Sequence, residues 1–459
     1  MKPWLKITLA LLAVIVVAGG GLFYWMSRPD VAQVSELDTS GRAPRMTETR
    51  TQTFPTIAVA EATGWAGGAK PVAAAGLQVA AFADKLDHPR SLYRLANGDV
   101  LVAEANSPPR DGGGITGWVM GKMMKKAGAG SPSANRITLL RDTDGDGAAD
   151  HRSVLLDAGN GLNSPTGMAV VGDWLYVANT DALVRYPFKP GDTKIAAKPE
   201  KIVDLAGGGN HWARNLLASP DGQLLYVAIG SASNIAENGL DAEGAIYSGG
   251  RTAKGARAAI LEVNPETKTA RVYAWGLRNP NAMAFEPHSG ALWTVVNERD
   301  MLGSDMPPDY LTQVDLGAFY GWPWNYWGGY VDKRVTPERP DLRQYTRRPD
   351  FGLGAHTAPL GLVFANDAKL GANYAKGAFI SLHGSWNREP PSGYKIVYVP
   401  FGDNGYPAAG AKPVDLLTGF LGKDGKTAMG RPVGVITDAT GALLVADDVG
   451  NTIWRVSAK

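Results

Sequence analysis

The sequence predicts an all-β protein, a six-bladed β-propeller preceded by an N-terminal transmembrane helix. One local pattern occurs six times: a polar or Pro-marked start leads into a short apolar run, a Gly turn and a second apolar run. Each copy is typical of a β-hairpin. The irregular spacing of the copies fits propeller blades with insertions better than a strict solenoid. The glycines that open the second runs are Gly98, Gly172, Gly222, Gly290, Gly377 and Gly441.

Composition supports a turn-rich β architecture. The chain holds 57 Gly and 30 Pro, which are scattered, and helical periodicity is hard to find after residue 30. A pair of β-sandwiches is the alternative fold. The 46 basic and 44 acidic residues nearly balance, which argues against a nucleic-acid partner. The absence of cysteine excludes disulfides, thiolate metal sites and a cysteine nucleophile.

The N-terminus, residues 1–26, predicts a membrane anchor. Lys2 and Lys6 precede an uncharged run from Ile7 to Trp25, which as a helix would span roughly 28 Å, close to the thickness of a bilayer core. The basic end should stay cytoplasmic, which would leave the rest of the chain on the periplasmic side of the cytoplasmic membrane. A cleaved signal peptide is the alternative, although its apolar region is usually shorter.

The remaining chain divides into two parts. Residues 27–75 are polar, broken by Pro and without sustained periodicity, which predicts a flexible linker. Residues 76–459 carry the six copies and predict the propeller. The innermost strand of each blade begins beside the central axis, so the polar residues at these starts should converge on one funnel. They are Arg90, Ser164, His211, Arg214, Asn215, Arg278, Asn279, His356 and Arg431. Several cations around one cavity call for an anionic partner.

Four segments carry a resemblance to a known family. They read HWARNLLASPDGQLLYVAIGSASN, YAWGLRNPNAMAFEP, NERDMLGSDMPPDYLTQVDLGAFYGWP and SLHGSWNREPPSGYKIVYVPF. In this order they resemble the glucose/sorbosone dehydrogenase family, quinoprotein six-bladed propellers that use pyrroloquinoline quinone (PQQ) with calcium. The resemblance runs from about residue 76 to the end. The last segment and the N-terminal anchor are similar to the membrane-bound L-sorbosone dehydrogenase branch.

The resemblance implies a catalytic base and a cofactor grip. His211 matches the general base, which takes the proton of the sugar C1 hydroxyl while a hydride passes to the quinone. The ordinary pKa of histidine, about 6.5, suits that task. Arg278 and Asn279 match the family's Arg-Asn pair on the cofactor, where a guanidinium can grip a carboxylate with two hydrogen bonds.

Other positions depart from the family pattern. Arg431 matches one of two basic residues on the last inner strand, but the second position is Val433. A Lys-Arg contact of the fifth blade has no direct counterpart, so His383 or Arg388 would have to replace it.

Substrate and metal positions follow from the same resemblance. His356 and Trp386 would border the substrate pocket. Glu298 and Asp300 stand where the family offers mostly backbone oxygens to the active-site calcium, and their carboxylates could bind a hard cation. A solvated acidic loop is the alternative for these two residues.

The segment RDTDGDGAAD predicts a structural calcium turn. Asp142, Asp144, Asp146 and Asp150 have the spacing of an EF-hand loop, but Ser153 stands where the bidentate Glu should be. The flanking runs are strand-like, so the loop should join two outer strands away from the funnel. A turn held by its own aspartates, without an ion, is the alternative.

Together these observations predict PQQ-dependent oxidation of an aldose or a sugar-derived aldehyde such as L-sorbosone at the outer face of the membrane. Electrons would pass to a membrane quinone or a cytochrome. One alternative is a non-catalytic propeller that binds sugars or proteins after losing the cofactor. Another is a calcium-dependent lactonase, which would need carboxylates at an axis where this chain is mostly basic. No Ser-His-Asp, P-loop or zinc-ligand spacing is found in the sequence.

Overall fold

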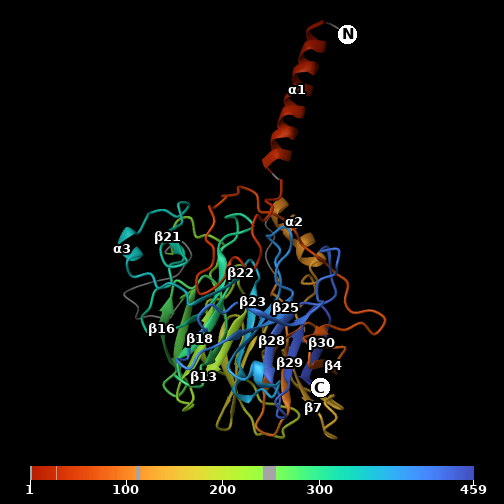
Figure 1. Ribbon diagram of the computed structural model, residues 1–459, viewed down its shortest axis with the longest axis vertical. Helices are drawn as coiled ribbons and strands as arrows, with labels where there is room; N and C mark the ends of the chain where they lie inside the picture. The colour runs from red at the N-terminus through yellow and green to blue at the C-terminus, as the bar shows by residue number, and fades with distance from the viewer. Residues whose placement is uncertain (1–2, 27, 110–113, 241–254) are drawn as a thin grey trace.

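The computed structural model describes residues 3–26, 28–109, 114–240 and 255–459, and shows a six-bladed β-propeller (Figure 1). Blades 1 to 3 consist of β5 (Pro89–Arg94), β6 (Val100–Glu104), β7 (Arg136–Arg141) and β8 (His151–Leu156); of β9 (Gly167–Val171), β10 (Trp174–Ala178), β11 (Ala182–Pro187) and β12 (Glu200–Asp204); and of β13 (Arg214–Ala218), β14 (Leu225–Ile229), β15 (Ala259–Asn264) and β16 (Thr269–Trp275).

Blades 4 to 6 follow the same antiparallel order. They consist of β17 (Pro280–Phe285), β18 (Leu292–Val296), β19 (Pro308–Gln313) and β22 (Phe351–Ala355); of β23 (Pro359–Phe364), β24 (Gly377–Leu382), β25 (Lys395–Pro400) and β26 (Val414–Thr418); and of β28 (Pro432–Thr437), β29 (Leu443–Asp447), β30 (Thr452–Ala458) and β4 (Leu77–Ala83).

The remaining helices, turns and strands lie outside the four strands of each blade. They are α1 (Pro3–Met26), α2 (Gly114–Lys126), α3 (Pro340–Arg343), β1 (Ser40–Gly41), β2 (Glu61–Ala62), β3 (Val72–Ala73), β20 (Asn325–Tyr326), β21 (Tyr330–Val331), β27 (Thr427–Ala428) and the 3₁₀ turns η1 (Ala158–Asn160), η3 (Ala365–Asp367) and η4 (Ala372–Tyr374).

The six predicted hairpins are the two inner strands of the six blades, so the propeller prediction is confirmed. Each turn glycine has a positive backbone φ, from 55° at Gly172 to 157° at Gly377. Residues with a Cβ rarely adopt this range of φ. The inner strands β5, β9, β13, β17, β23 and β28 surround an axial cavity of about 290 Å³. The second strands, such as β6, β14 and β29, are buried along their whole length, because neighbouring blades cover both of their faces.

The ring closes by joining the two ends of the propeller sequence in blade 6. Strand β4, the first of the propeller, pairs antiparallel with β30, the last, and brings Val79 opposite Val456. This pairing covers the edge that an open ring would expose.

The N-terminal helix forms over the segment that the sequence indicated. Helix α1 covers Pro3–Met26 and stands away from the propeller in Figure 1. Among the residues that the structure describes, no helix combines the length and the apolar character that crossing a membrane requires. The transmembrane part of the prediction is therefore not supported by this structure.

Residues 28–75, called the strap below, are not the flexible linker that the sequence predicts. The strap lies over the end of the propeller that also carries α2 (Figure 1). Strand β1 pairs with β22, β3 with β26, and β2 with β27. Thr56 and Ala60 are each only 1% exposed. The prediction failed because two-residue strands are too short to show a period, and their pairing uses backbone groups that every sequence has.

Helix α2 is a second departure from the expected all-β chain. It covers Gly114–Lys126, between β6 and β7, with the sequence GITGWVMGKMMKK. The glycines within this segment weaken its helical pattern, and its two C-terminal lysines lie where the helix dipole favours cations.

Candidate active site

A cavity of about 420 Å³ lies at the end of the propeller where the inner strands begin. Antiparallel neighbours bring the start of one strand and the end of the next to the same edge, so the lining residues come from these junctions. Among the predicted site residues, the structure brings together His211, Arg278, Asn279, Glu298, Asp300, His356 and Trp386. The predicted convergence on one funnel therefore holds for residues from blades 3, 4 and 5.

His211 is held in one tautomer. Its Nδ1 lies 2.8 Å from the carbonyl oxygen of Ser231 and 3.0 Å from the hydroxyl oxygen of the same residue. A carbonyl oxygen only accepts, so Nδ1 carries the proton and Nε2 keeps its lone pair. A Cβ on Gly230 would collide with Oδ1 of Asn279 and would lie 2.5 Å from Cβ of His211, so only glycine permits this approach.

The surroundings keep His211 neutral. Burial, together with the positive charge of Arg278, lowers the pKa of His211 to about 3, against the opposing effects of the Ser231 carbonyl and Asp300. A histidine that is neutral at physiological pH, with Nε2 unprotonated, has the form of a general base.

This pKa predicts an acid-dependent loss of stability. Because the folded pKa of about 3 lies below the usual value of 6.5, the unfolded chain binds one more proton between these values, and stability falls as the pH drops below 6.5. One such histidine contributes a slope of roughly 1.4 kcal/mol per pH unit. We expect His211→Gln to reduce the slope of unfolding free energy against pH by about that amount between roughly pH 6.5 and 4.5, measured by urea unfolding. An unchanged slope would show that His211 does not titrate in this way.

Arg278 is fixed by four residues of the protein. Its Nη2 donates to Oδ1 of Asn234 at 2.8 Å and lies 3.2 Å from Oδ2 of Asp300. Its Nη1 donates to the carbonyl oxygens of Glu298 at 2.6 Å and Asn297 at 3.4 Å. The guanidinium is therefore rigid, and the charge that it places beside His211 does not move.

Two buried carboxyl groups of the cavity and the imidazole of His356 have shifted pKa values. Burial raises the pKa of Glu298 to about 7 and that of Asp309 to about 6. Burial alone would lower the pKa of His356, but Asp300 outweighs it and raises that pKa. Nδ1 of His356 lies 3.5 Å from Oδ1 of Asp300, and its Nε2 lies 2.9 Å from the carbonyl oxygen of Gly303.

A second polar group surrounds Asp448, beside the axis. The Asp448 cluster consists of Asp448 with His88, Arg90 and His383, from blades 6, 1 and 5. Nε2 of His383 lies 3.0 Å from Oδ2 of Asp448, Nε2 of His88 lies 3.5 Å from the same atom, and Arg90 forms an ion pair with it. Burial lowers the pKa of His383 to about 4, although Asp448 opposes the shift. Arg90 also lies over the ring of Trp212, which lines the cavity, so the cluster and the cavity adjoin.

Arg431 lies close to this cluster. Its Nη2 donates to the hydroxyl oxygen of Tyr394 at 2.9 Å, and its charge lowers the pKa of His383. Arg431 is 4% exposed. His383 and Arg431, both predicted cofactor residues, lie beside the cavity and are not part of its lining.

In the part of the chain that the structure describes, several buried polar atoms in and beside the cavity have no hydrogen-bond partner. Among the described residues, Nε of Arg90 and Nε of Arg431 have no hydrogen-bond partner, and neither do Oε1 of Glu298 and Oδ1 of Asn297. Buried polar atoms are rarely left unpaired. The two donors fit the carboxylates of PQQ, and the two acceptors fit a hard cation such as Ca²⁺.

Comparison with known proteins identifies the family. A family model described as TrAA12-like matches residues 71–309 and 338–459. The chain belongs to the TrAA12-like family.

Two curated relatives match part of the chain. An uncharacterized protein of Borreliella burgdorferi is 34% identical over 200 residues, which is 43% of this chain and 52% of that protein. The pyrroloquinoline quinone-dependent pyranose dehydrogenase of Coprinopsis cinerea is 30% identical over 241 residues, 40% of this chain and 31% of that protein. The matches thus span about half, or less, of these relatives.

The holo form of the PQQ domain of pyranose dehydrogenase from Coprinopsis cinerea has the same fold. Its TM-score is 0.65 at 20% identity, covering 87% of this chain and 100% of that one. The resemblance to PQQ-dependent sugar dehydrogenases is confirmed at the level of the family, while the L-sorbosone branch stays a prediction.

Not every predicted residue of this TrAA12-like chain reaches the cavity. Arg388 donates to the carbonyl oxygens of Pro390 at 2.8 Å and of Val34 at 2.9 Å, so the structure uses it to hold the strap and not to face a cofactor. Arg214 donates to the carbonyl oxygens of His211 and Ala213 at 2.8 Å each, and to that of Ala206. The Nη groups of both arginines donate to carbonyl groups that sequence patterns do not show, while Nε of each has no partner among the described residues.

Sequence reasoning missed several lining residues. They are Val59, Met123, Met124, Ala127, Asn210, Trp212, Asn234, Asn297, Met301, Ala358 and Ser385. Asn234 is the most important of them, because it orders Arg278 and also accepts from the backbone N–H of Asp300 at 2.9 Å. The signal that could have found it was its position: Asn234 follows the buried strand β14 in a polar loop at the edge that carries His211.

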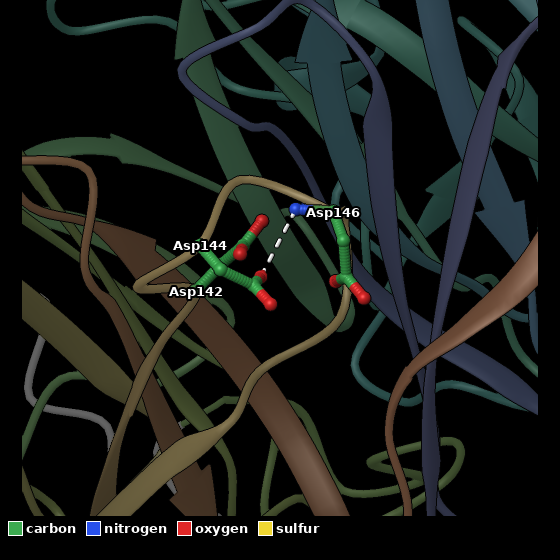
Figure 2. Close-up of side chains that lie close together, drawn as sticks. All are labelled: Asp142, Asp144 and Asp146. Atoms are coloured by element: carbon green, nitrogen blue, oxygen red, sulfur yellow. Dashed lines mark hydrogen bonds between the residues drawn. The ribbon is translucent and has the colours of Figure 1, made fainter.

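The predicted calcium loop lies between β7 and β8. Carboxylate oxygens of Asp142, Asp144 and Asp146 lie within 4.8 Å of one another, and Figure 2 shows the three side chains on one turn. Asp150 instead accepts from the backbone N–H of Thr143 at 3.0 Å. Because strands alternate in direction, this loop lies at the end of blade 1 opposite the cavity. Its position away from the funnel is as expected, and the ion stays a prediction.

Proposed function

We propose that the protein is a PQQ-dependent dehydrogenase that oxidises an aldose or a sugar-derived aldehyde. The observation that carries this proposal is His211, whose Nδ1 is hydrogen-bonded to the Ser231 carbonyl, so that an unprotonated Nε2 is present at the cavity beside Arg278. The family assignment and the sugar dehydrogenases among the relatives support it.

The residues of the site would have separate roles in the proposed reaction. Nε2 of His211 would accept the proton of the C1 hydroxyl, or of the hydroxyl of a hydrated aldehyde, as the C1–H bond breaks and C1=O forms. When bound, PQQ supplies the acceptor for the hydride that leaves C1. Arg90, His383 and Arg431 would hold its carboxylates. Arg278 and Asn279 lie in the cavity wall, where the fixed guanidinium stabilises negative charge.

One observation favours the non-catalytic alternative. The guanidinium of Arg278 is already satisfied by Asn234, Glu298 and Asp300, as it would be in a purely structural role. Cofactor binding separates the two hypotheses. The full chain is titrated with PQQ in the presence of Ca²⁺ by calorimetry, and reduction of a dye is followed with aldoses and with L-sorbosone. Stoichiometric PQQ binding and sugar-dependent reduction are expected, and failure to bind PQQ would overturn the proposal.

The acidic turn between β7 and β8 is proposed as a structural calcium site. Its three carboxylates already lie together, and Asp142 accepts from the backbone N–H groups of Gly145 at 2.8 Å and Gly147 at 2.9 Å. Ca²⁺ at a hundredfold excess over its Kd should stabilise the fold by about 2.7 kcal/mol. We expect thermal melts to show a rise in Tm with Ca²⁺ that Asp144→Ala removes and His211→Gln keeps. A rise that survives Asp144→Ala would place the ion elsewhere.

Location and electron acceptor are proposed from the sequence alone. Lys2, Lys6 and the uncharged run that follows them support export of the propeller with the N-terminus retained at the cytoplasmic membrane. A membrane quinone or a cytochrome would then be within reach. Cell fractionation with protease protection tests this proposal, and a protein found wholly in the soluble cytoplasmic fraction would contradict it.

A further inference from the structure

The strap forms part of the cavity wall although most of it lies outside the matched family region, which begins at residue 71. Val59, on the strap, lines the cavity and is 8% exposed. The neighbouring Ala58 donates its backbone N–H to the carbonyl oxygen of Trp386 at 2.9 Å. The strap therefore contributes one apolar side chain to the wall and holds a second, Trp386, in place.

The strap also fixes the loop that carries Asp300 and Met301. The backbone N–H of Gln52 donates to the carbonyl oxygen of Met301 at 3.1 Å, and that of Arg50 donates to Leu302 at 2.9 Å. Nη2 of Arg50 lies 2.8 Å from Oδ2 of Asp30 and 2.9 Å from Oδ2 of Asp305, within one ion-paired group. These contacts place the strap and the loop in one rigid unit.

Asn387 joins the three parts of this wall. It is 0% exposed. Its Nδ2 donates to the carbonyl oxygen of Thr56 at 2.8 Å, and its Oδ1 accepts from the backbone N–H of Met301 at 3.0 Å. One buried side chain, on the residue that follows Trp386, thus connects the strap to the Met301 loop, and neither can shift without breaking a buried hydrogen bond.

We propose that the strap determines substrate size, with Val59, Met301 and Trp386 as the wall that limits the sugar to a single ring. The inference rests on the proposed function. A cavity of about 420 Å³ is at the small end of ligand sites, so an apolar side chain at its wall decides whether a second sugar ring is admitted. Asn387 and Thr56 act as positioning residues for this wall.

Two strap residues that are two positions apart provide the test. Val59 lines the cavity, whereas Ile57 is 47% exposed. In the full chain loaded with PQQ and Ca²⁺, we expect Val59→Ala to raise the KM for glucose roughly tenfold and to shift the preference in kcat/KM toward maltose, with kcat within about twofold. Ile57→Ala should match the wild type. Equal sugar preference in both variants and the wild type would overturn the inference and leave the proposed function standing.

Hydrogen exchange tests the positioning residues without any turnover. In the full chain, Asn387→Ala should cause the amide of Met301, and the strap amides of Gln52 and Arg50 that donate to this loop, to exchange at least about tenfold faster, with blade 1 unchanged. Unchanged exchange at the Met301 loop would overturn the role of Asn387. If the wild type neither binds PQQ nor oxidises sugars, the proposed function fails, while this measurement still decides whether the strap holds the wall.

Discussion

His211→Gln is expected to lower kcat by roughly 10²- to 10⁴-fold while PQQ still binds. The glutamine keeps polar atoms at the site but has no nitrogen lone pair that can accept the proton of the C1 hydroxyl. The structure fixes the tautomer through the Ser231 carbonyl and keeps the ring neutral, so both conditions for a general base are lost together. Steady-state dye reduction gives kcat, and calorimetry gives the PQQ affinity.

His288→Gln is the matched control for this experiment. His288 is an exposed histidine away from the cavity, and its replacement should leave kcat and PQQ binding as in the wild type. If the His211→Gln variant keeps more than about a tenth of the wild-type kcat, His211 is not the general base and another group of the cavity accepts the proton.

Arg278→Ala should reduce PQQ affinity by at least about a hundredfold and lower the free energy of unfolding by about 3–5 kcal/mol. Removal of the guanidinium takes a charge partner from Asp300 and leaves Oδ1 of Asn234 and the carbonyl oxygen of Glu298 without this donor. Arg278→Lys should fall between the alanine variant and the wild type, because an ammonium keeps the charge without the planar fork. Urea unfolding and PQQ calorimetry measure the two effects.

Arg271→Ala is the control for the stability effect. Arg271 is 53% exposed and pairs with Glu262 at 2.7 Å, and such surface pairs contribute at most about 1 kcal/mol. If Arg278→Ala is destabilised but binds PQQ as tightly as the wild type, Arg278 supports the cavity and is not a cofactor contact.

The site was predictable where the chemistry lies next to a hairpin. His211 lies shortly before the inner strand β13, and Arg278 and Asn279 lie shortly before β17, so the order of the repeated pattern placed them at one end of the axis. Arg388 was predicted to contact the cofactor because its segment, after β24, belongs to the same edge. Its side chain instead donates to the carbonyl oxygen of Val34 in the strap. Nothing in a local pattern shows which carbonyl groups a buried arginine will meet.

The inner hairpins of the blades follow from local sequence alone, because the Gly turn and the two apolar runs of each hairpin are neighbours in the chain. The other features depend on contacts between distant segments. The strap is ordered by backbone pairing that leaves no trace in side-chain periodicity, and the Asp448 cluster joins His88 to Asp448 only because β4 and β30 close the ring. The neutral form of His211 likewise depends on burial and on Arg278, a residue from the next blade. Long-range contacts of this kind follow from the closed ring and not from any single segment.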